Sequence, residues 1–177
     1  PPPRLPAGGG GGGWRVGGRG RPHADWPAIW PIIEAVVRAG ETYTYPRDLT
    51  EAGGRAIWMQ APPGVTLVAL DDDGRVLGTA KTGPNQMGPG AHVATASFMT
   101  APEARGRGVG RALGEAVIAH ASRKGFRAMQ FNAVVEANHG AVRLWRALGF
   151  EILATIPEAF DHPTEGLVGL HVMHRRL

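Results

Sequence analysis

The chain contains no cysteine, so disulfides, a thiolate nucleophile and sulfur-rich metal sites are excluded. It also has no apolar run near the roughly 18 residues that a membrane-spanning helix needs, and its first residues lack the charged-then-apolar order of a signal peptide. The aspartates at 71–73 precede a glycine and are typical of a hairpin turn rather than of a metal site. We expect a cytoplasmic protein with no membrane contact and no bound metal.

Excess positive charge is absent outside the first residues. The formal net charge is +4 over 177 residues, but residues 1–22 contain four arginines and no acid, which leaves 15 basic and 15 acidic residues in 23–177. A neutral body gives no support for nucleic-acid binding. We therefore expect no nucleic-acid partner.

The first 22 residues differ in composition from the rest. They are rich in proline and glycine, so they can bury too little apolar surface to offset the entropy of ordering, and we expect a disordered tail. A short strand around 14–16 remains an open alternative. Residues 23–177 are long enough for a sizeable core and are expected to form a single domain.

Apolar periodicity divides residues 23–177 into helices and strands. Apolar spacings of three and four residues predict helices, and runs of β-formers bounded by Gly, Pro or Asp predict strands. The expected helices cover about 25–39, 48–59, 109–125 and 138–148, and the expected strands cover 65–70, 75–81, 91–99, 126–135, 150–156 and 167–174, with a Pro-containing loop at 157–163. Hairpins come first and crossover helices later, so we expect an α+β (mixed α/β) fold with a mixed sheet.

The chemistry is concentrated in the segment T-A-P-E-A-R-G-R-G-V-G-R-A-L, residues 100–113. An apolar run ends before it and a helical pattern follows it. Glycine lets the backbone turn tightly and bring several N–H groups close to one ligand, and the first turn of a helix adds unpaired N–H groups and the positive end of its dipole. The segment thus predicts a binding site for a diphosphate. Its glycines are Gly106, Gly108 and Gly110, and its arginines are Arg105, Arg107 and Arg111.

Two common phosphate-binding loops do not match this segment. No Lys-Ser or Lys-Thr pair follows the glycines, as the P-loop requires. The dinucleotide fingerprint G-x-G-x-x-G places its last glycine at Arg111 or Leu113. What remains is R-x-x-G-x-G from Arg105 to Gly110. A flexible Gly/Arg turn or an RNA contact is the alternative at this point, although an RNA-binding surface needs interleaved aromatics or a basic body.

The R-x-x-G-x-G segment resembles the coenzyme A pyrophosphate loop of the GNAT (Gcn5-related) N-acetyltransferases. A second segment, N-H-G-A-V-R-L-W-R-A-L-G-F from Asn138 to Phe150, resembles the family's N-x-x-A-x-x-L-[YW]-x-x-x-G-F, and one helix and one strand separate the two motifs. The resemblance covers about residues 25–177. It implies the GNAT fold, a central mixed but mostly antiparallel sheet of about six or seven strands flanked by about four helices, and acetyl-CoA as co-substrate.

Three further segments resemble one branch of this family. They are H-V-A-T-A-S-F-M at 92–99, F-N-A-V-V-E-A-N at 131–138 and P-E-A-F-D-H-P-x-x-G-x-V at 157–168. The branch includes yeast N-acetyltransferases that act on azetidine-2-carboxylate, a proline analogue, and similar actinobacterial proteins. The resemblance implies transfer of an acetyl group to the amine of a small molecule, such as a proline analogue or another amino acid, and a homodimer.

The resemblance also implies which residues form the site. Thr95 and Asn132 would hold the acceptor, and backbone groups near Met99 and Thr100 would bind the pantetheine arm and polarise the thioester carbonyl, which makes Thr95, Thr100 and Asn132 the expected catalytic group. The expected coenzyme-binding residues are Met99, Thr100, Arg105, Gly106, Arg107, Gly108, Val109, Gly110, Arg111, Asn138 and Trp145. Asn138 can also cap the helix that it precedes.

Two positions depart from the family. Many members have Tyr where Trp145 stands, and indole has an N–H but no usable acid function. The branch is expected to have Asn where this chain has the shorter Thr95. These departures keep a catalytically silent acyl-CoA binder open as an alternative. A protein or peptide acetyltransferase is a second alternative, which the neutral body and the lack of an acidic patch disfavour.

The proton acceptor is not evident in the sequence. Without cysteine a covalent enzyme thioester is excluded, so direct attack of the amine in a ternary complex is expected, with much of the rate coming from the positioning of both substrates. His92 and His171 are candidate bases by residue type, although a lone strand histidine is more often structural. The loop of Tyr43 and Tyr45 is either a wall of the substrate cleft or plain aromatic packing.

Overall fold

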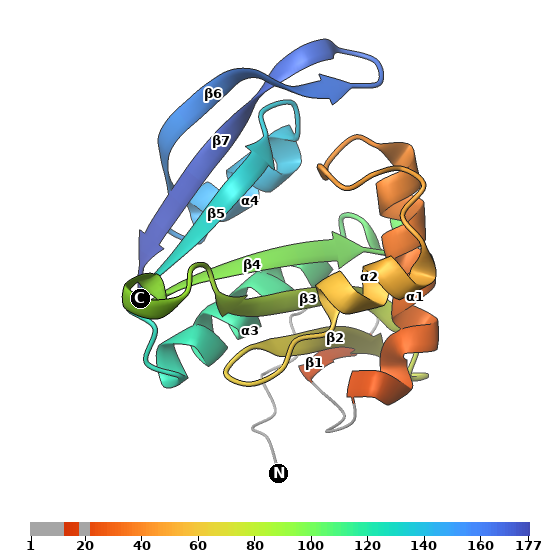
Figure 1. Ribbon diagram of the computed structural model, residues 1–177. Helices are drawn as coiled ribbons and strands as arrows, with labels where there is room; N and C mark the ends of the chain where they lie inside the picture. The colour runs from red at the N-terminus through yellow and green to blue at the C-terminus, as the bar shows by residue number, and fades with distance from the viewer. Residues whose placement is uncertain (1–12, 18–21) are drawn as a thin grey trace.

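The computed structural model describes residues 13–17 and 22–177. Its strands form one seven-stranded sheet in the order β1-β2-β3-β4-β5-β7-β6 (Figure 1), in which β4 and β5 are parallel and the other neighbours antiparallel. The mixed, mostly antiparallel sheet expected from the sequence is confirmed. The strands are β1 (Trp14–Gly17), β2 (Val65–Asp71), β3 (Val76–Pro84), β4 (Val93–Thr100), β5 (Ala128–Val135), β6 (Glu151–His162) and β7 (Gly166–Arg176). The α-helices of the described residues are α1 (Pro22–Ala39), α2 (Glu51–Trp58), α3 (Val109–Arg123) and α4 (His139–Ala147).

The N-terminal segment is more ordered than its composition suggests. Trp14–Gly17 pairs with β2 along the edge of the sheet, so the open alternative of a short strand around 14–16 is confirmed and the expectation of disorder is wrong for these residues. The remainder of that prediction, at 1–12 and 18–21, lies outside the described residues. Helix α1 begins at Pro22 rather than after Asp25, since proline is well suited to the first turn of a helix.

The expected loop at 157–163 is wrong, because β6 continues to His162. Pairs such as Phe160 with Val168 and His162 with Gly166 join β6 to β7 along this stretch. The register shifts between Ile156 and Phe160, and the irregularity contains the proline at 157. Proline cannot donate to a ladder and is tolerated at bulges and on edge strands, and β6 is the edge strand.

The two faces of the sheet are covered by different helices (Figure 1). A Cβ placed on Gly78 of β3 would lie 3.1 Å from Val109 and 3.2 Å from Leu113, both in α3. The next residue, Thr79, accepts a hydrogen bond of 2.9 Å from the indole N–H of Trp58 in α2. Because side chains alternate along a strand, odd-numbered residues of β3 face α2 and even-numbered ones face α3.

The middle of the sheet is split. The parallel strands β4 and β5 pair only through Val93 with Ala128 and Ala94 with Met129. Beyond these pairs the two strands diverge toward their carboxyl ends, so that β5, β7 and β6 form a wing set at an angle to β1–β4 (Figure 1). Within the described residues no helix is long and apolar enough to cross a bilayer.

Helix α3 packs tightly on α4 at one glycine, which gives a first prediction. A Cβ on Gly114 would lie 2.7 Å from the Leu148 side chain and 3.2 Å from the Trp145 ring, whereas a Cβ on Gly140 of α4 would meet nothing within 4 Å. We expect Gly114→Val to lower the free energy of unfolding by about 1–3 kcal/mol through overpacking. Gly140→Val should stay within about 0.5 kcal/mol of the wild type. Denaturant unfolding of both variants measures the difference, and equal stabilities would contradict the packing described.

Candidate active site

A cleft of about 910 Å³ opens where β4 and β5 diverge. Its walls come from β4, the turn after β4, the start of α3, β5, α4 and the segment 41–45. Among the residues expected to form the site, it is lined by Thr95, Met99, Thr100, Arg105, Gly106, Gly108, Val109, Gly110, Arg111, Asn132, Asn138 and Trp145. Arg107 is exposed and does not line the cleft.

The backbone of β4 presents alternate residues to the cleft. Ala101 donates its N–H to Leu77 of β3 at 2.9 Å, while the N–H and C=O of Phe98 bond instead to the hydroxyl of Tyr43. Since hydrogen-bonded and non-bonded pairs alternate in an antiparallel ladder, the groups that face the gap belong to even-numbered residues. The backbone of Met99 therefore faces β3, and Thr100 is the better placed of the two residues expected to offer backbone groups.

The turn after β4 leaves several backbone donors unused. Gly106 and Gly108 have φ of 75° and 79°, values that a residue with a Cβ adopts only under strain. The N–H groups of Arg105 and Arg107 bond to Pro102 and Ala104 within the turn. Those of Gly106, Gly108, Val109, Gly110 and Arg111 meet no acceptor among the described residues. They lie at the positive end of the α3 dipole, an arrangement that suits a phosphate group.

The turn's two cleft-lining arginines differ in availability. The guanidinium of Arg111 donates to Glu115 at 3.0 Å, one turn along α3, and both side chains are about half exposed. Arg105 forms no ion pair with the residues that the structure describes. Arg105 is therefore the freer positive charge at this end of the cleft.

Two residues of the second motif lie on the opposite wall. The side chain of Asn138 accepts a hydrogen bond of 3.2 Å from the N–H of Ala141, so its role as the α4 N-cap is confirmed. Trp145 is only 7% exposed, with its ring centroid 4.6 Å from that of Phe98 and 5.0 Å from that of Phe131. It packs between the diverging strands as a core residue that also borders the cleft.

The other end of the cleft lies on the face covered by α1 and α2. Thr95 and Ser97 of β4 share this face with Lys81 of β3, which pairs with Ser97. Asn132 donates to the side-chain oxygen of Asn85 at 2.7 Å. The sequence did not identify Lys81 or Ser97, because only strand register brings them beside Thr95.

The tyrosine loop forms a wall at this end. Tyr43 and Tyr45 stack with ring centroids 5.5 Å apart and an interplanar angle of 7°, and both line the cleft. The loop is therefore stacked aromatic packing that also borders the cleft, and its contact with substrate stays a prediction. Burial raises the pKa of the Tyr43 hydroxyl far above its ordinary value of 10.0, an effect that its bond with the Phe98 backbone partly offsets, and burial also raises the pKa of Tyr45.

Neither candidate histidine lies in the cleft. His92 is exposed, with Nδ1 3.0 Å from the Pro89 carbonyl oxygen. His171 is 8% exposed and its Nδ1 lies 2.7 Å from the Thr155 hydroxyl. The carboxylate that borders the cleft is Glu41, which the sequence did not identify.

No metal centre forms among the residues that the structure describes, where no group of three or more His, Cys, Asp or Glu could hold an ion. The aspartates at 71–73 form the expected turn. The side chain of Asp71 accepts the N–H of Arg75 at 2.8 Å, and its carbonyl accepts the N–H of Gly74 at 3.1 Å.

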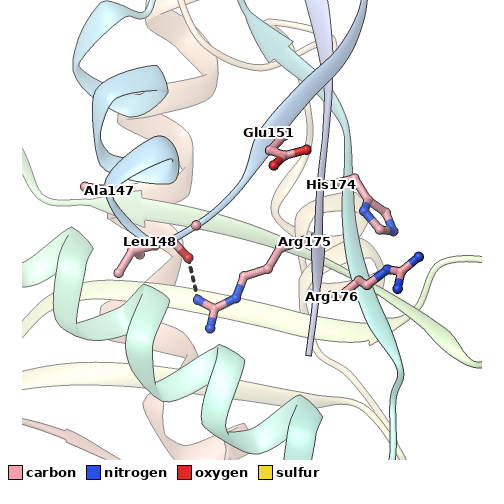
Figure 2. Close-up of a pocket in the computed structure, with 7 residues that line it drawn as sticks. Ala147, Leu148, Glu151, His174, Arg175 and Arg176 are labelled. Atoms are coloured by element: carbon pink, nitrogen blue, oxygen red, sulfur yellow. Dashed lines mark hydrogen bonds between the residues drawn. The ribbon is translucent and has the colours of Figure 1, made fainter.

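A second hollow, of about 650 Å³, lies beside the carboxyl end of β7. Figure 2 shows the Arg175 guanidinium turned toward the carbonyl of Leu148, to which it donates a hydrogen bond, while His174 and Arg176 extend from β7 on its other side. Leu148 is the C-cap of α4, so Arg175 satisfies a terminal carbonyl and interacts with the negative end of the helix dipole. We interpret this hollow as structural.

Residues of both sequence motifs line the cleft, and comparison with known proteins identifies the family. A family model described as the acetyltransferase (GNAT) family matches residues 29–150. The chain belongs to this family. This GNAT protein is also 32% identical over 97 residues to the N-acetyltransferase aca1 of Schizosaccharomyces pombe, a match that spans 55% of the chain and 46% of that relative. The chain thus covers less than half of the curated relative.

Solved structures of this family superpose over most of the chain. A GCN5-related N-acetyltransferase from Kribbella flavida is 56% identical, with a TM-score of 0.87, and the match covers 93% of this chain and 98% of that one. A phosphinothricin acetyltransferase from Sinorhizobium meliloti, solved in complex with acetyl-CoA, is 25% identical, with a TM-score of 0.81 and coverage of 94% and 88%.

The tyrosine loop gives a prediction that needs no ligand, because the chain has only these two tyrosines. The raised pKa values mean that the unfolded state ionises first above about pH 10. Stability should therefore be unaffected by these groups below pH 10 and fall as the pH rises beyond it. An ultraviolet titration of tyrosinate should show a midpoint above 10 in the folded protein and about 10 in denaturant.

Single variants separate the two tyrosines. The protein with Tyr45→Phe, which retains Tyr43, should titrate at higher pH than the protein with Tyr43→Phe, since Tyr43 has the larger shift. A folded wild type that titrates near pH 10 would contradict the burial described.

Proposed function

We propose that the protein transfers the acetyl group of acetyl-CoA to the amine of a small molecule, by direct attack in a ternary complex. The acceptor that we propose is an amino acid such as a proline analogue. The observation that supports this most is the split between β4 and β5, since one continuous cleft there joins unused backbone donors at the turn before α3 to a polar pocket on the α2 face.

The coenzyme end fits a diphosphate. The N–H groups of Gly106 and of residues 108–111 would bind the pyrophosphate, with Arg105 adding charge. Backbone groups of Ala96 and Thr100 that face the gap would bind the pantetheine amides, and Asn138 would contact the coenzyme from the α4 side. When bound, acetyl-CoA supplies an acetyl group activated as a thioester.

The backbone N–H of Thr100 is our candidate for polarising the thioester carbonyl. The equivalent N–H of Phe98 already donates to the Tyr43 hydroxyl at 2.8 Å, whereas Thr100 has no such partner among the described residues. A donor placed at a developing oxyanion can contribute about 3–4 kcal/mol to lowering the barrier.

Proton transfer needs little from the cleft walls. The acceptor amine arrives as an ammonium, and Glu41 is the cleft carboxylate that could take its proton, directly or through water. Thr95 and Asn132 would orient the acceptor. Trp145 offers no acid function, but a free thiol has a pKa of about 8.5, so the thiolate can leave near neutral pH without an acid.

One solved relative supports a small acceptor, since the Sinorhizobium structure is named for phosphinothricin, a small molecule. A protein or peptide acceptor and a silent acyl-CoA binder remain outcomes of the tests below. The homodimer and the cytoplasmic location stay predictions, and sedimentation of the whole chain would test the first.

The turn before α3 offers a matched pair of arginines to test coenzyme binding. Acetyl-CoA or CoA at about 100 times its Kd should stabilise the wild type by about 2.7 kcal/mol. Arg105→Ala should weaken affinity for both about tenfold, since a charge-assisted hydrogen bond contributes about 1.5–3 kcal/mol. Arg107→Ala, two residues away and outside the cleft, should leave affinity unchanged. Thermal unfolding with each ligand measures this, and no shift for the wild type would overturn the coenzyme site.

Catalysis is tested by release of CoA thiol from acetyl-CoA with a panel of amines. The panel contains azetidine-2-carboxylate, proline, other amino acids, polyamines and N-terminal peptides. We expect thiol release with a small amino acid at a rate well above that without acceptor. Release with peptides alone would favour the protein acetyltransferase, and coenzyme binding without release from any amine would favour the silent binder.

A further inference from the structure

A lysine in the cleft has no carboxylate partner. Lys81 extends from β3 on the face covered by α2 and lines the cleft beside Thr95 and Ser97. Its ammonium donates to the carbonyl of Ile57 at 2.8 Å and lies 5.6 Å from the centroid of the Trp58 ring. No acidic side chain among the described residues lies within ion-pair distance of it.

Two contacts stabilise the charged form of this lysine, and its burial opposes them. Ile57 and Trp58 end helix α2, so the Ile57 carbonyl belongs to the negative end of the helix dipole. The indole face adds a cation–π attraction. Burial lowers the pKa of Lys81, because nearby solvent no longer fully compensates the charge. A lysine has three N–H donors, and one of them is used by Ile57.

The missing counter-ion is not the coenzyme. Lys81 pairs with Ser97, three residues before the end of β4, which puts it about 10 Å along the strand from that end, and the turn that would bind the diphosphate lies beyond it. It also lies on the face of the sheet opposite to α3, since Gly78 faces α3 and odd-numbered residues of β3 face α2. A negative group on the acceptor is therefore better placed than the diphosphate to reach Lys81.

We propose that Lys81 determines acceptor specificity by pairing its ammonium with a carboxylate of the acceptor. This inference rests on the proposed function, because it places the acceptor in the same cleft. Thr95, Ser97 and Asn132 line the same cleft with hydroxyl and amide groups, and the tyrosine pair would provide an apolar wall for the acceptor's carbon skeleton. Amines without an acidic group would leave a partly buried ammonium unpaired, which disfavours their binding.

The test compares two acceptors that differ only in the carboxylate, azetidine-2-carboxylate and azetidine. With saturating acetyl-CoA, Lys81→Met should raise the KM for azetidine-2-carboxylate about 10–100-fold, the loss expected for one charge-assisted contact. It should not raise the KM for azetidine, which no longer leaves an ammonium unpaired, and it should leave the affinity for acetyl-CoA unchanged. Lys81→Arg, which keeps the charge, should recover part of the loss. The chain's other lysine is Lys124, the C-cap of α3 outside the cleft, so Lys124→Met is the matched control and should change neither KM.

Two results would overturn the proposal. One is an equal change of both KM values, or of neither, in Lys81→Met. The other is an equal loss of kcat in Lys81→Met and Lys81→Arg with both acceptors and an altered pH profile, which would make Lys81 the base instead.

Calorimetric titration of azetidine-2-carboxylate into CoA-loaded protein separates this inference from the proposed function. If the wild type binds the compound more tightly than Lys81→Met but releases no thiol, the catalytic proposal fails and the role of Lys81 stands. If the wild type acetylates it and Lys81→Met does so equally well, the role of Lys81 fails and the catalytic proposal stands. If the wild type neither binds nor acetylates it while CoA still stabilises the protein, the role of Lys81 is overturned.

Discussion

The separation of β4 from β5 is the constraint on which the site depends. Parallel neighbours normally pair along their length, but here pairing stops after Ala94 and Met129. Phe98 and Phe131, one from each strand, then pack against Trp145, with centroid distances of 4.6 and 5.0 Å to its ring. Unpaired backbone groups inside a protein are costly, and the Tyr43 hydroxyl satisfies both polar groups of Phe98. The remaining backbone groups of β4 along the gap have no partner among residues 13–17 and 22–177, so a ligand could bond to them.

The split also gives the two substrates separate approaches. Unused N–H groups and Arg105 gather where α3 begins, whereas Lys81, Ser97 and Thr95 lie on the face covered by α2. A coenzyme and an acceptor that enter from these two ends would meet between the diverging strands. Holding two reactants in attack geometry is a large part of catalysis for a reaction of this kind, and here the sheet itself would provide that alignment.

The structure gives a physical reason for the two departures from the family, Trp145 and Thr95. Trp145 is a buried member of the aromatic cluster that keeps the strands apart, so its size serves packing where a phenol would serve proton transfer. Trp145 belongs to α4, and the close contact between α3 and α4 at Gly114 holds α4 in place. Thr95 shares its face of the sheet with Lys81 and Ser97, so an acceptor bound there, as we propose, would meet a charge as well as hydrogen-bonding groups.

The sequence by itself determined the local features of this protein. Glycine spacing, helical periodicity and the cap at Asn138 predicted the turn, the helices and most strands, because each depends on residues a few positions apart. It misjudged Trp14–Gly17 and residues 157–162, whose strand structure depends on pairing with distant partners rather than on composition. Only the tertiary structure decided that the backbone groups of Met99 face β3. It also decided that the candidate bases His92 and His171 lie outside the cleft and that Lys81 lines it. Strand register and divergence set these positions, and both arise from contacts between residues far apart in the chain.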